Sequence, residues 1–171
     1  MNGRREDVLL PANRGFIAFS FGVAFLLNLL PWDAHWPVPD FVAMVLVFWS
    51  LSQPRLVGIG IGFCFGLLMD VHGAALLGQH ALAYSLLAYG AISLHRRLPW
   101  FGLAGRMLHL LPLFLLAQAC NLIVRMAAGD AFPGLHYFLP SLSAGLLWPL
   151  IERMLTAPQR RALERDETRP L

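Results

Sequence analysis

Six apolar runs, separated by short breaks that hold turn-forming and charged residues, constrain this chain more than any other feature. They cover residues 15–31, 38–53, 56–70, 78–95, 106–126 and 136–155. Only 13% of the 171 residues are charged, against about 25% in a soluble domain. Long apolar runs with the charges gathered between them are typical of chains that cross a membrane several times. We therefore predict an all-α polytopic membrane protein with six transmembrane helices.

The basic residues predict how these helices are oriented. All thirteen are arginines, and only Arg125 lies toward the outer side when the N-terminus is placed in the cytoplasm. The positive-inside rule therefore puts both termini in the cytoplasm. The first run ends in Pro31-Trp32 without a small-residue cleavage site, so we predict a retained first helix. The predicted organisation is a cytoplasmic segment (1–14), a six-helix transmembrane domain (15–156) and a charged cytoplasmic tail (157–171).

Several classes of function lack the residues that they need. The six histidines show no pair at a spacing of three or four, and the chain has no phosphate-binding loop and no serine in a nucleophile setting. Cys64 and Cys120 lie inside apolar runs without ligand or disulfide spacing, as reduced core residues do. The arginines form no basic stripe interleaved with aromatic residues. We predict no catalytic residue, no metal or other cofactor and no nucleic acid, and anionic membrane lipids as partners of the arginines.

A stripe of small residues runs along the third apolar run and ends in an acid. Gly58, Gly62, Gly66 and Asp70 are spaced four apart, which places them along one face of a helix. Such a stripe lets another backbone approach, either from the same bundle or from a second protein. Asp70 is either solvated at the outer surface or buried against a backbone donor or an arginine, for which Arg125 is the outer-side candidate. We take these four residues as a candidate partner interface.

Three polar side chains mark one face of the fifth apolar run. Gln118, Asn121 and Arg125 are spaced three and then four apart, in the outer half of the predicted helix. Polar groups at this depth face the bundle interior, a cavity or a partner rather than lipid. Asn28, near the outer end of the first run, is a candidate hydrogen-bond partner for this intramembrane polar face.

The outer entry to the second run reads Pro39-Asp40-Phe41. Proline restricts the direction of the chain, and Asp40 stands where a helix is expected to begin, so that the helix dipole favours its carboxylate. We therefore predict a structural role for this entry.

Residues 36–90 together resemble the MreD family of bacterial rod shape-determining membrane proteins. The matching pieces are Pro39-Asp40-Phe41, Trp49, Pro54, Gly58, Gly62-Phe63, Gly66-Leu67-Leu68-Met69-Asp70, Gly78, Ala81-Leu82-Ala83-Tyr84-Ser85 and Ala88-Tyr89. They cover about a third of the chain, and the flanks match in hydropathy alone. In similar proteins a glycine usually stands four residues after the acid, where this chain has Ala74 after Gly73, so we expect a different turn after Asp70.

The resemblance implies a role without enzymatic activity in the cell-elongation complex of the inner membrane, which organises peptidoglycan synthesis and cell shape. MreC, a single-span protein with a periplasmic domain, is the implied partner. MreB, RodA and a class B penicillin-binding transpeptidase belong to the same assembly. A homo-oligomer is a further candidate assembly for this chain.

The resemblance also implies a fold similar to the six-helix substrate-binding subunits of energy-coupling-factor vitamin transporters. The alternative function is therefore a small-molecule-binding subunit of such a transporter, with a ligand in an outer cavity. Those subunits often carry a small-residue docking stripe on the first helix, whereas here the stripe lies on the third run. This difference favours the scaffold.

Overall fold

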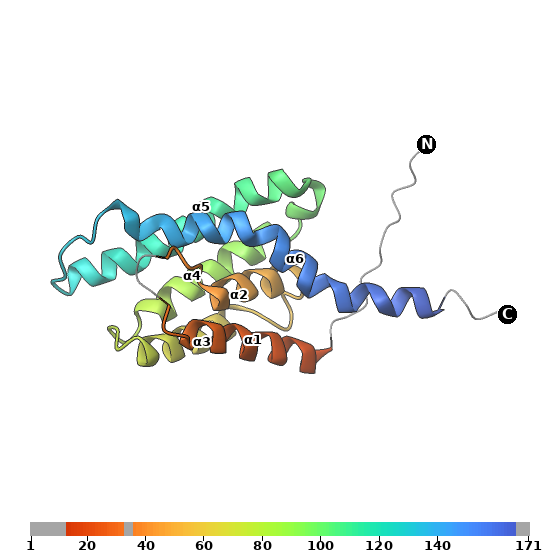
Figure 1. The fold of residues 1–171 in the computed structure, drawn as a ribbon, viewed down its shortest axis with the longest axis horizontal. Coiled ribbons are helices and arrows are strands. Elements are labelled where there is room, and N and C mark those ends of the chain that lie inside the picture. The colour runs from red at the N-terminus through yellow and green to blue at the C-terminus, as the bar shows by residue number, and fades with distance from the viewer. Residues whose placement is uncertain (1–12, 33–35, 167–171) are drawn as a thin grey trace.

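The structure, a computed structural model, describes residues 13–32 and 36–166, with side chains as far as Gln159. Within these ranges the chain forms six α-helices and two short 3₁₀ helices (Figure 1). All six apolar runs are therefore helical. The elements are α1 (Arg14–Leu29), α2 (Phe41–Ser52), α3 (Ile59–His72), α4 (Gln79–Leu94), η1 (Leu98–Trp100), α5 (Leu103–Ala127), η2 (Leu135–Phe138) and α6 (Leu139–Asp166).

Local sequence signals explain where several helices begin and end. Asn13 and Asp40 are the N-cap residues of α1 and α2, and their side chains accept hydrogen bonds from the backbone N–H groups of Gly15 and Ala43. These bonds satisfy donors that a helix N-terminus leaves without partners. α2 ends at Ser52, shortly before Pro54, because the residue preceding a proline disfavours the helical conformation.

α6 is longer than its apolar run predicts. The run ends at residue 155, whereas the helix continues through Pro158 to Asp166. Part of the range 157–171, which we predicted as a charged tail, is therefore helical. In Figure 1 the last turns of α6 extend beyond the rest of the bundle. Hydropathy marks only the apolar part of a helix, so it places the end of this one too early.

α2 is the central helix of the bundle. It packs against α1, α4 and α6, and every residue from Val42 to Ser50 is buried. A helix that is apolar on all sides belongs in the interior of a fold. α2 is only 12 residues long, about 18 Å, and it does not need to match the thickness of the lipid because its neighbours shield it.

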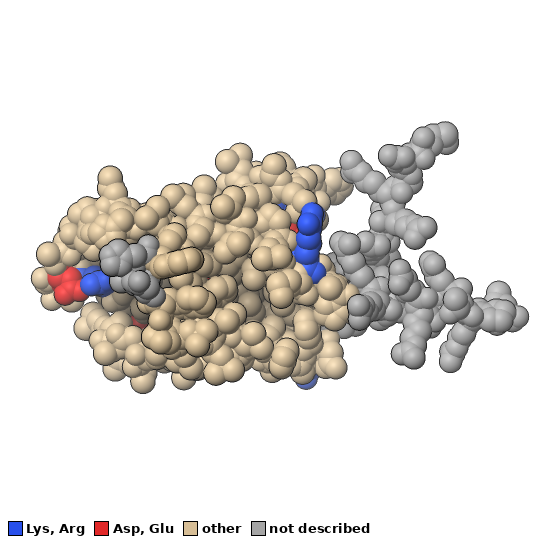
Figure 2. All heavy atoms as spheres, viewed as in Figure 1, with Lys and Arg blue, Asp and Glu red and all other residues tan. Residues whose placement is uncertain are grey.

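The exposed surface around the sides of the bundle is apolar along most of its length. Among the described residues, α5 alone is long and apolar enough to cross a membrane by itself, and only 17% of its most apolar stretch is buried in the protein. The core helix of a soluble protein is mostly buried. α1, α2 and α3 are shorter apolar helices. Figure 2 shows blue and red atoms near the two ends of the molecule, with a broad, mainly uncharged belt between them.

Candidate functional site

α3 and α4 lie very close together, and two glycines of the stripe make this approach possible. A Cβ atom at Gly62 would lie 2.8 Å from the carbonyl oxygen of Tyr84, and one at Gly66 would lie 2.3 Å from Cα of Ala81. The buried residues of α3 are these two glycines and Asp70. The stripe is therefore the face on which α3 packs against α4 of the same chain.

Asp70 completes this contact by capping α4 from outside that helix. Its carboxylate is fully buried and accepts hydrogen bonds from the backbone N–H groups of Gly78 (2.8 Å), His80 (2.7 Å) and Ala81 (3.4 Å). The ring nitrogen Nδ1 of His80 also lies 2.8 Å from Asp70 Oδ1. Gly78, the N-cap residue of α4, has no side chain to satisfy these donors. Asp70 supplies the missing acceptor at the positive end of the helix dipole, which offsets the cost of burying its charge.

The turn between α3 and α4 contains a strained residue. Ala74 has a φ of +46°, in the left-handed region that glycine adopts without steric cost. This is the position at which the sequence departs from the related pattern, which has glycine there. The backbone N–H of Ala75 donates to the carbonyl oxygen of Asp70 at 3.0 Å, so the turn is tied to the capping acid.

These contacts correct our interpretation of the stripe as a partner interface. Gly62, Gly66 and Asp70 face α4 of the same chain and leave no room for a second protein. Gly58 is the N-cap residue of α3, with an extended backbone, so it is not part of the helical face at all. Of the two settings considered for Asp70, burial against backbone donors is the one that the structure shows, and Arg125 does not contact it.

Asp40 joins three helices at the outer entry. Besides capping α2, it accepts a hydrogen bond from the side-chain amide of Asn28 at 2.8 Å and one from the hydroxyl group of Tyr84. Asn28 also accepts from the backbone N–H of Phe41 at 3.0 Å. Asn28 therefore bonds to the start of α2. The prediction that it bonds to the polar face of α5 is wrong. The entry holds α1, α2 and α4 together.

The polar face of α5 is divided between a cavity and the protein surface. Gln118 donates to the carbonyl oxygen of Tyr137 and accepts from the hydroxyl group of Ser141. Gln118 and Asn121 line a cavity of about 180 Å³ that also reaches Asp40 and Tyr84. The side-chain oxygen of Asn121 is buried there without a hydrogen-bond partner among the described residues.

Arg125 does not line this cavity. Its Nε atom lies 3.0 Å from Oδ2 of Asp130, and its guanidinium group lies 6.0 Å from the centre of the Tyr137 ring. Both side chains of the ion pair are substantially exposed. Arg125 therefore belongs to the C-terminal end of α5, with the loop that follows this helix.

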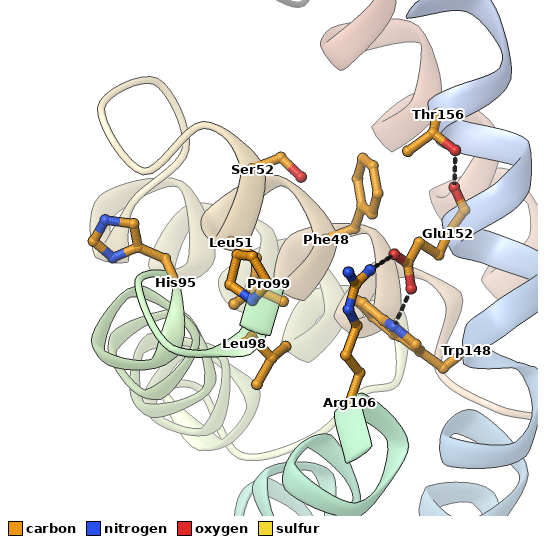
Figure 3. A pocket seen from close by; sticks show the side chains of 10 residues that line it. All are labelled: Phe48, Leu51, Ser52, His95, Leu98, Pro99, Arg106, Trp148, Glu152 and Thr156. Carbon is orange, nitrogen blue, oxygen red and sulfur yellow. Dashed lines mark hydrogen bonds and ion pairs between the residues drawn. The ribbon is translucent and has the colours of Figure 1, made fainter. Parts of the chain in front are cut away.

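A second polar cluster lies at the opposite end of the bundle, where sequence reasoning missed it. Arg106 of α5 forms an ion pair with Glu152 of α6, and the indole N–H of Trp148 donates to Glu152 Oε2 at 3.1 Å. Figure 3 shows these side chains pointing toward one another beside Phe48 of α2. The cluster borders a cavity of about 290 Å³. Glu152 is the one acid within the sixth apolar run. An isolated acid in an apolar run is costly without a partner, so its position could have marked Glu152 as a candidate for a polar contact.

No cofactor site emerges from the part of the chain that is described. Among those residues, no three histidine, cysteine or acidic side chains are grouped as metal ligands would be. The two cysteines are free thiols, and Cys64 is exposed on α3 rather than buried in the core as we had expected. The polar clusters at the two ends connect helices to one another.

The described residues form a six-helix bundle with an apolar belt around its surface and charges near its ends. These features define an α-helical membrane protein. Residues 12–157 match the family described as rod shape-determining protein MreD. The chain therefore belongs to the MreD family, whose members determine cell shape. It is 29% identical over 147 residues to the rod shape-determining protein MreD of Haemophilus influenzae. The aligned region covers 82% of this chain and 88% of that protein. No solved structure gives a significant match.

Proposed function

We propose that this protein is a multi-pass scaffold of the bacterial inner membrane that binds MreC and helps to organise peptidoglycan synthesis during cell elongation. The observation that carries this proposal is the family match over residues 12–157, which includes α1 to α5 and α6 as far as residue 157. MreB, RodA and the class B penicillin-binding transpeptidase would be reached directly or through MreC. The protein would act by holding partners in place and would not catalyse a reaction.

The distribution of charge supports an orientation with both termini in the cytoplasm. Arg14, Arg55 and Arg106 lie at one end of the bundle, together with the cluster around Glu152. The outer end carries Arg125 paired with Asp130. The positive-inside rule makes the first end cytoplasmic, and α6 leaves the bundle on that side (Figure 1).

The polar contacts inside the bundle, rather than cavity size, argue against the transporter alternative. A cavity of about 550 Å³, lined by Trp36, Gln118 and Tyr137, is within the usual range of about 300–1,000 Å³ for small-molecule pockets. The adjoining cavity beside Asn121 measures only about 180 Å³. Gln118, Ser141, Asp40 and Tyr84, which line it, already bond to one another or to the backbone. This arrangement suits a contact between helices better than the capture of a vitamin-sized ligand.

Purification from native membranes tests the proposal. A tagged copy, expressed at the native level in place of the original gene, is extracted in mild detergent and its bound proteins are identified by mass spectrometry. We expect MreC and the transpeptidase to be enriched over a matched purification of an unrelated six-helix membrane protein. Recovery of an ATP-driven transport module, or of a tightly held vitamin, without MreC would overturn the scaffold function.

The structure also changes which variants can probe docking. A side chain larger than hydrogen at Gly62 meets the backbone of Tyr84, so loss of MreC from a Gly62→Leu variant would report a damaged fold. Gly22 is a better position, because no atom lies within 4 Å of a Cβ placed there and the residue is exposed on α1. Substitutions at such exposed positions, scanned around the belt, can map the MreC surface without disturbing the bundle.

A further inference from the structure

An open groove lies between the first turns of α1 and α3. It measures about 680 Å³ and is bounded by the two helices and by the turn that precedes α3. Its walls are apolar, with Ile17 and Phe21 on α1 and Ile61 and Phe65 on α3. The rings of Phe21 and Phe65 stack at 4.5 Å between centroids and close the inner end. Apart from this aromatic pair, α1 and α3 make few contacts with each other. The groove occupies the space between them.

Two arginines lie at the open end of this groove. Arg14 is the first residue of α1, and Arg55 belongs to the turn before α3. Both line the groove, and both are exposed. A guanidinium group binds a phosphate through two parallel hydrogen bonds and stays charged at all physiological pH values. The groove therefore combines positive charge at the membrane surface with an apolar channel below it.

The depth of the groove fits one leaflet of a bilayer. The lining residues of α1 end at Phe21, seven residues after Arg14, and this distance along a helix is about 10 Å. One leaflet contributes about 15 Å of hydrocarbon. A membrane-spanning helix of another protein crosses about 30 Å of hydrocarbon, whereas this groove would cover only about a third of that length. Its length and charge favour a lipid over a protein helix.

We propose that this groove binds one anionic phospholipid of the cytoplasmic leaflet. The lipid phosphate lies between Arg14 and Arg55, and the upper part of an acyl chain lies along the apolar walls of α1 and α3. The bound lipid fills the space between two helices that otherwise touch mainly through their phenylalanine pair. The assignment to the cytoplasmic leaflet rests on the orientation proposed above, whereas the lipid contacts themselves need no partner protein.

Native mass spectrometry of the purified protein in detergent tests the proposal, with dioleoylphosphatidylglycerol as the probe and dioleoylphosphatidylcholine as the neutral comparison. We expect one phosphatidylglycerol to be retained in preference to phosphatidylcholine. An arginine near a membrane surface gives about a fivefold gain in affinity for anionic lipid, so Arg14→Gln and Arg55→Gln should each weaken retention about fivefold. Arg97→Gln is the matched control, because Arg97 is exposed near the same end but does not line the groove.

A second pair of variants tests the apolar channel without removing charge. Gly60 lines the groove and has no atom within 4 Å of a Cβ position, so Gly60→Leu should fill the channel while the bundle stays folded. Gly22→Leu, equally unobstructed but outside the groove, is its control. We expect Gly60→Leu to lower phosphatidylglycerol retention and Gly22→Leu to leave it unchanged, with the same elution volume for both proteins.

Three results would overturn the proposal. One is equal retention of phosphatidylglycerol in the wild type, the arginine variants and Gly60→Leu. Another is displacement of the lipid by inorganic phosphate at concentrations that leave the detergent micelle intact, because the apolar channel would then contribute nothing. The third is loss of MreC from Gly60→Leu with lipid retention unchanged, which would make the groove a protein-binding site.

Discussion

Replacing Gly66 with alanine adds one methyl group to the tightest point between α3 and α4. The new Cβ atom would lie 2.3 Å from Cα of Ala81 and 2.5 Å from its backbone nitrogen. Backbone atoms cannot rotate out of the way. To reach an ordinary carbon–carbon contact of about 3.5 Å, the two helices must separate by about 1.2 Å.

The same separation disrupts the cap that Asp70 provides. Its bonds of 2.7 and 2.8 Å to the start of α4 would stretch to about 4 Å, beyond hydrogen-bond range. Overpacking costs about 1–3 kcal/mol, and each weakened hydrogen bond to a charged group costs about 1.5–3 kcal/mol. We therefore expect Gly66→Ala to lower the free energy of unfolding by about 3 kcal/mol or more, and the melting temperature by about 6–12 °C.

The assay is thermal unfolding of the purified protein in detergent, followed by intrinsic tryptophan fluorescence. Gly60→Ala is the matched control, since the chemical change is the same on the same helix and no atom lies within 4 Å of the new Cβ. Alanine is favoured over glycine within a helix by up to about 1 kcal/mol, so this variant should melt at the same temperature or higher. Equal melting temperatures for the two variants would refute the close packing of α3 on α4.

Three further variants test other parts of the structure by the same melting assay. Ala74→Gly should raise the stability by about 1 kcal/mol, since it relieves the left-handed backbone at φ +46°; a decrease would contradict that strain. Tyr84→Phe removes the hydroxyl group that bonds to Asp40 and should cost about 1–3 kcal/mol, whereas Tyr89→Phe, at an exposed side chain, should cost nothing measurable. Glu152→Gln should destabilise the protein by weakening its contacts with Arg106 and Trp148, and the double variant with Arg106→Gln should lose less than the sum of the single effects.

The sequence predicted the helices well because each one leaves a local pattern. Apolar runs identify all six helices. Asp40 is recognisable as the residue before a helix because it follows Pro39 and directly precedes the unbroken apolar stretch that begins at Phe41. The spacing of Gly62 and Gly66 also correctly indicates a smooth helical face. A periodic pattern defines which side of a helix packs, but it does not say which helix lies opposite, so the choice between α4 and a second protein stayed open.

The polar contacts were harder to predict because they join residues that lie far apart along the chain. Asn28 and Tyr84 meet at Asp40 only when α1, α2 and α4 are assembled. Nothing near Arg106 in the sequence indicates that Glu152, on the next long helix, will be its partner. The groove between α1 and α3 likewise exists only when both helices are in place. In the sequence, the residues of each wall resemble an ordinary lipid-facing surface.

The capping of α4 by Asp70 has a consequence for how the protein is made. The donors that compensate this buried carboxylate begin at Gly78 and therefore emerge from the ribosome after the acid itself. Until α4 packs against α3, the nascent chain carries this carboxylate without the donors that compensate it. A product truncated in this turn lacks those donors permanently. The α3–α4 hairpin is thus the smallest unit of the chain that contains Asp70 together with its hydrogen-bond donors.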